Sequence, residues 1–109
     1  MWITIDSEHY IFNFHKDSLA EKNIQHIICC QENCYDVICR VLIIVLDKKI
    51  NYYLCNTREE VGKLCGDNEP CNGFCRYPDK EKDGVYALYN EDIKCLGYHE
   101  DAHYIAFMQ

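Results

Sequence analysis

The residue pattern most suggestive of catalysis lies near the end of the chain. His99-Glu100-Asp101-Ala102-His103 matches the H-E-x-x-H pattern of zinc hydrolases, in which the histidines bind the metal and the glutamate acts on its bound water. That chemistry needs both histidines on one face of a helix, one turn apart. Here the flanking Tyr98 and Tyr104 favour strands. A metal-dependent hydrolase using His99, Glu100 and His103 is therefore our last hypothesis, and we expect no enzyme.

Cysteines offer a second kind of chemistry. Cys71 and Cys75 have the C-x3-C spacing of zinc knuckles, and Cys65 lies just upstream. A structural zinc site needs four ligands, so the fourth would have to approach from another part of the chain. A zinc-binding module organised by Cys65, Cys71 and Cys75 is our alternative hypothesis, with zinc as its cofactor. Otherwise no cofactor is expected, and the cysteines are reduced thiols or form a loop disulfide.

A further cysteine group has weaker spacing. Cys29, Cys30, Cys34 and Cys39 fall where the sequence predicts strands, and alternation along a strand would scatter them over two faces. We predict no metal site there.

Charge and length limit the partners. The chain has 109 residues, enough for a single domain over 1–109, and a net charge of −7. This charge opposes contact with nucleic acid and with anionic lipid, and favours a protein partner with a basic surface. The longest apolar run, Val41 to Leu46, is too short to cross a membrane, and the first residues lack the basic start of a signal peptide. We expect a cytoplasmic protein, in the host cytoplasm if it is viral.

Two short helices are predicted from capping boxes. Ser18 with Glu21 predicts a helix over about residues 19–23, and Thr57 with Glu60 predicts another that ends before Gly66. Before them, the alternating segments at residues 2–5 and 10–14 predict a β-hairpin.

The remaining apolar segments read as strands. Segments 25–30 and 35–46 are rich in Ile, Val, Tyr and Cys and are separated by a polar break at residues 31–33, which predicts two central strands. Another strand is expected at 50–55, and a three-stranded meander at 85–90, 93–100 and 103–108. The predicted fold is α+β: a mainly antiparallel sheet of about six or seven strands with two short helices.

The first hypothesis for function follows by elimination. A small acidic module without catalytic geometry is expected to be a non-enzymatic binding protein that acts through protein–protein interaction. Nine tyrosines, most on predicted strands, suit a recognition surface as well as a sheet. We assign partner binding to Tyr77, Asp79, Glu81 and Tyr98. In size and charge the chain is similar to phage-type inhibitors of host defence systems (anti-CRISPR-like), although no residue carries that likeness. Open sheet edges would also permit a homodimer.

Overall fold

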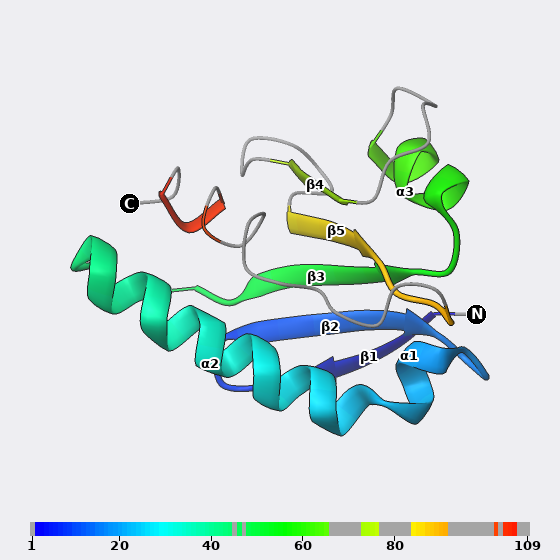
Figure 1. Ribbon diagram of the computed structural model, residues 1–109, viewed down its shortest axis with the longest axis horizontal. Helices are drawn as coiled ribbons and strands as arrows, with labels where there is room; N and C mark the ends of the chain where they lie inside the picture. The colour runs from blue at the N-terminus through cyan, green and yellow to red at the C-terminus, as the bar shows by residue number, and fades with distance from the viewer. Residues whose placement is uncertain are drawn as a thin grey trace.

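The fold is a mixed five-stranded sheet with helices on both faces (Figure 1). The computed structural model describes residues 2–44, 46, 48–65, 73–76, 84–91, 102 and 104–106. Along the chain the elements are β1 (Trp2–Asp6), β2 (Tyr10–His15), α1 (Leu19–Lys22), α2 (Ile24–Leu42), β3 (Ile50–Cys55), α3 (Arg58–Cys65), β4 (Gly73–Arg76) and β5 (Gly84–Leu88). No helix within these ranges combines the length and the apolar character that a membrane crossing requires.

The sheet has the strand order β1-β2-β3-β5-β4. The two outer pairs, β1 with β2 and β4 with β5, are antiparallel, whereas β3 runs parallel to both of its neighbours. The prediction of a mainly antiparallel sheet of six or seven strands is therefore wrong in strand number and in direction. Parallel neighbours need a crossover connection, and α2 supplies it between β2 and β3.

The largest error concerns α2, a 19-residue helix where two central strands were predicted. Its buried residues recur every three or four positions, which is the period of a helix and not of a strand: Ile24, Ile27, Gln31, Tyr35 and Ile38. The supposed polar break is one turn of this helix. Gln31 points into the core, where its Nε2 lies 3.5 Å from the Tyr52 hydroxyl as a long hydrogen bond. Composition favoured strands here, but burial every third or fourth residue stabilises the helix.

The predicted strand at 103–108 is also wrong. Residues 102 and 104–106 are helical, and Tyr104 and Ile105 are buried in the main core. The predicted strand at 93–100 lies outside the described residues. Of the meander, only the first strand is confirmed, as β5.

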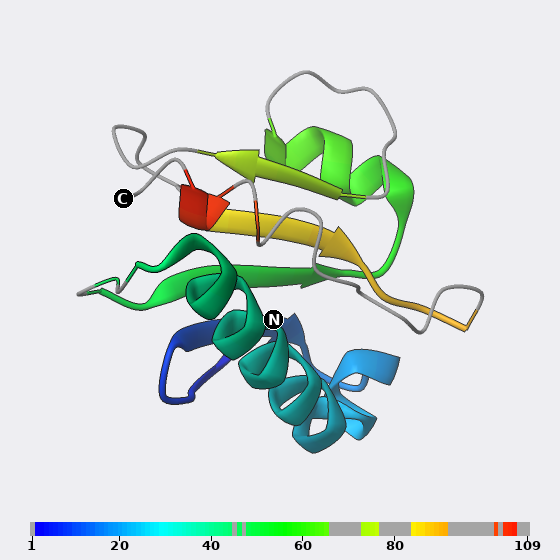
Figure 2. The same cartoon turned by 60° about the vertical axis from the view of Figure 1, so that its left-hand side comes forward.

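The two faces of the sheet carry separate cores. On one face, alternate residues of β2 and β3 pack against α2, among them Tyr10, Phe12 and Tyr52. On the other face, Tyr86 and Cys55 pack with Val61, which belongs to α3. Figure 2 shows α2 crossing the first face of the sheet, on the side away from α3. Every residue of β5 is buried because both faces of that strand are covered.

The predicted hairpin and the two predicted helix starts are confirmed. The hairpin forms as β1 and β2, and both capping boxes start helices. The Glu21 amide donates to the Ser18 hydroxyl (3.2 Å), and the Glu60 amide donates to the Thr57 hydroxyl (3.1 Å). These signals depend on neighbours in sequence alone, which is why they could be predicted.

Candidate functional site

Most of the predicted site residues lie outside the part of the chain that the structure describes. This holds for the hydrolase residues His99, Glu100 and His103 and for the partner-binding set Tyr77, Asp79, Glu81 and Tyr98. Helical backbone at 102 and 104–106 contradicts the strand at 103–108, one of the two predicted strands on which our ranking of the hydrolase rested; the other, at 93–100, lies outside the described residues.

The zinc hypothesis is also untested. Cys65 ends α3 and Cys75 lies in β4, and these two elements contact each other. Cys71 lies outside the described residues. The three-cysteine site therefore stays a prediction.

The described tyrosines do not form a recognition surface. Six of them are buried in the two cores: Tyr10, Tyr35, Tyr52, Tyr86, Tyr89 and Tyr104. Their rings pack on one another, as between Tyr53 and Tyr86, whose centroids are 4.5 Å apart. Their number reflects packing on a sheet, and any binding surface must be sought elsewhere.

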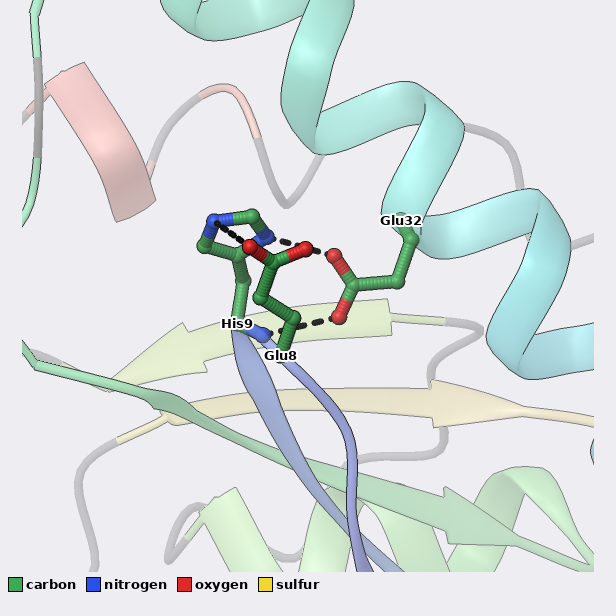
Figure 3. Close-up of side chains that lie close together, drawn as sticks. All are labelled: Glu8, His9 and Glu32. Carbon is green, nitrogen blue, oxygen red and sulfur yellow. Dashed lines mark hydrogen bonds and ion pairs between the residues drawn. The ribbon is translucent and has the colours of Figure 1, made fainter.

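A cluster of polar contacts joins the β1–β2 turn to α2 (Figure 3). Glu32 of α2 accepts three hydrogen bonds from this turn: from the Ser7 hydroxyl (2.6 Å), from the His9 amide (2.8 Å) and from His9 Nδ1 (2.5 Å). The His9 ring also stacks on Tyr35, with centroids 4.0 Å apart. Residues 23 to 25 positions apart are thereby held together.

The protonation state of Glu32 follows from these contacts. Burial raises the pKa of Glu32, but the hydrogen bonds from Ser7 and His9 and the nearby His9 charge outweigh it, so that the pKa lies below its ordinary value of 4.5. Burial also raises the pKa of the neighbouring Tyr35 to about 12, with a further contribution from Cys39. Near neutral pH, Glu32 is therefore a carboxylate and Tyr35 a neutral phenol.

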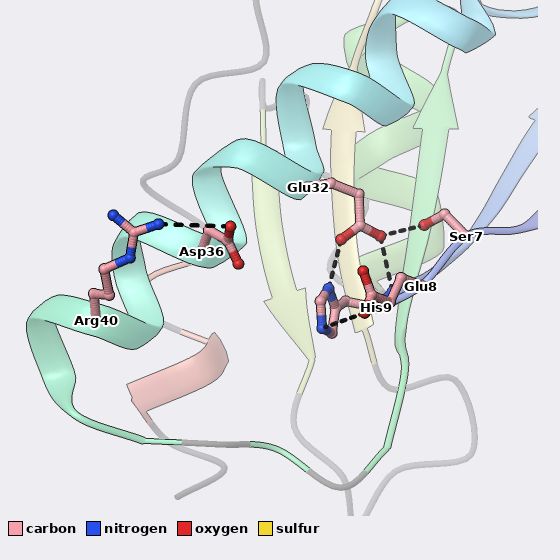
Figure 4. Close-up of polar contacts among 6 residues, drawn as sticks. All are labelled: Ser7, Glu8, His9, Glu32, Asp36 and Arg40. Atoms are coloured by element: carbon pink, nitrogen blue, oxygen red, sulfur yellow. Dashed lines mark hydrogen bonds and ion pairs between the residues drawn. The ribbon is translucent and has the colours of Figure 1, made fainter.

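This cluster resembles a metal site in composition but not in available ligands. Donor atoms of Glu8, His9 and Glu32 lie within 4.8 Å of one another. Both Glu32 oxygens already accept protein donors, which leaves His9 Nε2 and the Glu8 carboxylate, 4.0 Å apart. Glu8 is 82% exposed at its side chain. The arrangement in Figure 4 is therefore best explained as the contact that fixes the turn on α2.

A second histidine–carboxylate pair lies at the other end of β2. His15 Nε2 is 2.5 Å from Glu60, whose other oxygen accepts the Asn56 amide at 2.9 Å. Trp2 stacks on the His15 ring, with centroids 4.0 Å apart. This pair connects β2 to the start of α3 and also has a structural role. Among the described residues, no buried side-chain nitrogen or oxygen lacks a partner, so neither core directs an unsatisfied polar group at a ligand.

The outer face of α2 carries an exposed histidine–cysteine pair. His26 and Cys30, one helical turn apart, are both exposed, and the Cys30 sulfur lies 3.5 Å from His26 Nε2. The half-buried Cys34 and the exposed Val37 and Val41 follow at helical spacing toward the C-terminus. Reading this segment as strands hid the alignment, which a helical period would have predicted.

The exposed apolar residues of α2 gather at its C-terminal end. We call Val37, Val41, Leu42 and Ile43 the apolar patch; Val41 is 74% exposed and Ile43 is 88% exposed. In Figure 1 these last turns of α2 extend beyond the end of β2. Isolated exposed apolar residues are ordinary, but four within seven positions make this end of α2 the candidate contact surface.

No family model, curated protein or solved structure matches this chain, so its site has to be judged from its own geometry.

Proposed function

We propose that this protein acts by binding another protein through the apolar patch at the C-terminal end of α2. The observation that carries the proposal is the conformation and exposure of Ile43. This residue has φ 55° and ψ 53°, in the left-handed region, while its side chain is almost wholly exposed. Glycine is the residue that normally ends a helix in this conformation, because a β-branched side chain is strained there.

The end of α2 shows how Ile43 differs from its neighbour. The Ile44 amide donates to the Cys39 carbonyl at 3.1 Å, which closes the helix in a Schellman turn. Ile44 and Cys39 then both pack against the main core, as the apolar residues of such a turn usually do. The fold therefore uses Ile44, whereas Ile43 adds strain and contributes nothing to either core. An exposed, strained apolar residue supports a role in contact with a partner.

The chemistry of the patch defines the partner. Val37 and Val41 are one helical turn apart, the spacing by which a helix inserts apolar anchors into a groove of another protein. The net charge of −7 favours a basic rim around such a groove and disfavours an anionic membrane surface. We therefore propose a protein partner with an apolar groove and basic surroundings. No described residue argues for the phage-type inhibitor subclass in particular.

Crosslinking from the patch is the first step of the test. A photo-crosslinking phenylalanine derivative placed at position 41 should join the protein to a partner in the cells that produce it. The same derivative at Gln25, which is exposed at the start of the same helix, should not.

Binding of the purified partner is the second step. Val41→Lys suits the helix C-terminus electrostatically, so it should preserve the fold while it repels a basic groove. We expect calorimetric affinity to fall at least tenfold for Val41→Lys and to be unchanged for the matched control Gln25→Lys. Equal affinity of both variants, or binding of wild-type protein to anionic phospholipid vesicles in place of a protein, would refute the proposal.

A further inference from the structure

We infer that His26 and Cys30 form half of a zinc site, which a second copy of this chain completes with the same two residues. This site is distinct from the apolar patch and does not depend on the proposed function. It also differs from the three-cysteine site predicted from sequence, with which it shares no residue.

The first support is the distance between the two ligand atoms. In a tetrahedral zinc site, sulfur and nitrogen lie about 2.3 Å and about 2.1 Å from the metal, which places them about 3.6 Å apart. Cys30 Sγ and His26 Nε2 are 3.5 Å apart. The pair therefore has the separation that a shared ion requires, and the one-turn spacing on α2 maintains it.

The second support is the exposure of both residues. His26 and Cys30 both lie on the solvent side of α2. An ion bound there would have two protein ligands and would need two more to close a structural site. Because the pair is exposed, another molecule can approach it directly. A two-fold axis through the ion would supply His26 and Cys30 of the second copy, giving the Cys2His2 set common among structural zinc sites.

The charge balance of this site is favourable. Zinc binds the thiolate form of cysteine and the neutral form of histidine, so two thiolates neutralise the ion and two thiol protons are released to solvent. The ion then adds no charge to the interface between two acidic chains. Cys30 is about 16 Å along the helix axis from Val41, so the dimer would present two copies of the apolar patch.

Metal-dependent assembly tests the inference. The full chain, kept reduced with a phosphine and stripped with a chelator, is titrated with zinc and followed by native mass spectrometry and light scattering. We expect a monomer without zinc. With zinc we expect a dimer that holds one zinc per two chains, beyond any zinc that a single chain binds elsewhere. Cobalt in place of zinc should give the intense visible absorption of a tetrahedral site and a thiolate charge-transfer band.

Variants separate this site from other thiols. His26→Ala and Cys30→Ser should each abolish zinc-dependent dimerisation and the cobalt spectrum assigned to the dimer. Cys29→Ser, which changes the exposed neighbour on another side of the helix, should leave both intact. The double variant Cys71→Ser with Cys75→Ser should also dimerise, even if it loses a separate zinc. A dimer that survives Cys30→Ser, or zinc bound by His26 and Cys30 without dimerisation, would overturn the inference.

Discussion

The inner and outer faces of α2 both carry apolar residues, but these residues have different roles. The inner face places Ile27 and Ile38 in the main core, whereas the outer face leaves Val37 and Val41 in solvent. The buried set recurs every three or four residues along the whole helix, whereas the large exposed apolar residues occur only in its last turns. The inner face of α2 therefore stabilises the fold, and the outer face is available for contacts with other molecules.

The sharpest test of this difference truncates one residue on each face. Ile27→Ala should lower the free energy of unfolding by about 3 kcal/mol, because Ile27 is buried and its loss leaves a cavity. Val37→Ala should change it by less than about 0.5 kcal/mol, because Val37 is more than half exposed. Urea denaturation followed by circular dichroism measures both values. A comparable loss for the two variants would mean that the outer face also contributes to stability.

The sequence allowed the short-range features of the fold to be predicted, but not its long-range pairing. Ser18 and Thr57 revealed helix starts because capping involves residues three positions apart. By contrast, the parallel pairing of β2 with β3 depends on α2, whose Ile, Val, Tyr and Cys content is typical of strands. Once α2 was taken for strands, the sheet had to be antiparallel.

The site could be predicted less well than the fold, for a related reason. His26 and Cys30 contact each other only because they lie one turn apart on a helix. In the predicted strand the same two residues would lie too far apart for contact. Glu32 lies in the segment predicted as a polar break between two strands, and its partners Ser7 and His9 are more than 20 positions away. No pattern within the sequence indicates that contact.

The next test concerns the polar edge of α2, where Glu32 holds the β1–β2 turn. Glu32→Gln keeps the shape of the side chain but removes its charge, so the hydrogen bonds from Ser7 and His9 weaken. We expect a loss of about 1 to 2 kcal/mol near neutral pH, since hydrogen bonds to a charged group are stronger than neutral ones. Glu8→Gln is the matched control, and it should have almost no effect because Glu8 is highly exposed.

The pH dependence of the same pair gives a second measurement. The pKa of Glu32 is lower in the folded protein than its ordinary value of 4.5, so its stabilising contribution is present above that value. As the pH falls through the lower folded pKa, the carboxylate is protonated and this contribution is lost. The difference in unfolding free energy between wild type and Glu32→Gln should therefore shrink below about pH 4.5. A constant difference across this range would show that the Glu32 charge does not hold the turn.

The smallest expected effect is a gain of stability at the end of α2. Ile43→Gly relieves the strain of a β-branched residue in the left-handed region, and the greater freedom of glycine in the unfolded chain offsets part of this gain. We expect an increase of about 0.5 to 1 kcal/mol in the free energy of unfolding, measured by urea denaturation. Ile43→Ala also removes most of the side chain that a partner would contact. Because it retains a Cβ in the left-handed conformation, it should show little or no gain in stability.

Both Ile43 variants should weaken partner binding, because each removes most of an exposed apolar side chain from the patch. The two measurements together separate strain from contact. A glycine variant that is more stable and binds less well would show that Ile43 is unfavourable for folding and favourable for recognition. If the glycine variant were no more stable than the alanine variant, Ile43 would not be strained in the folded protein. The two faces of α2 would then differ only in the exposure of their apolar residues.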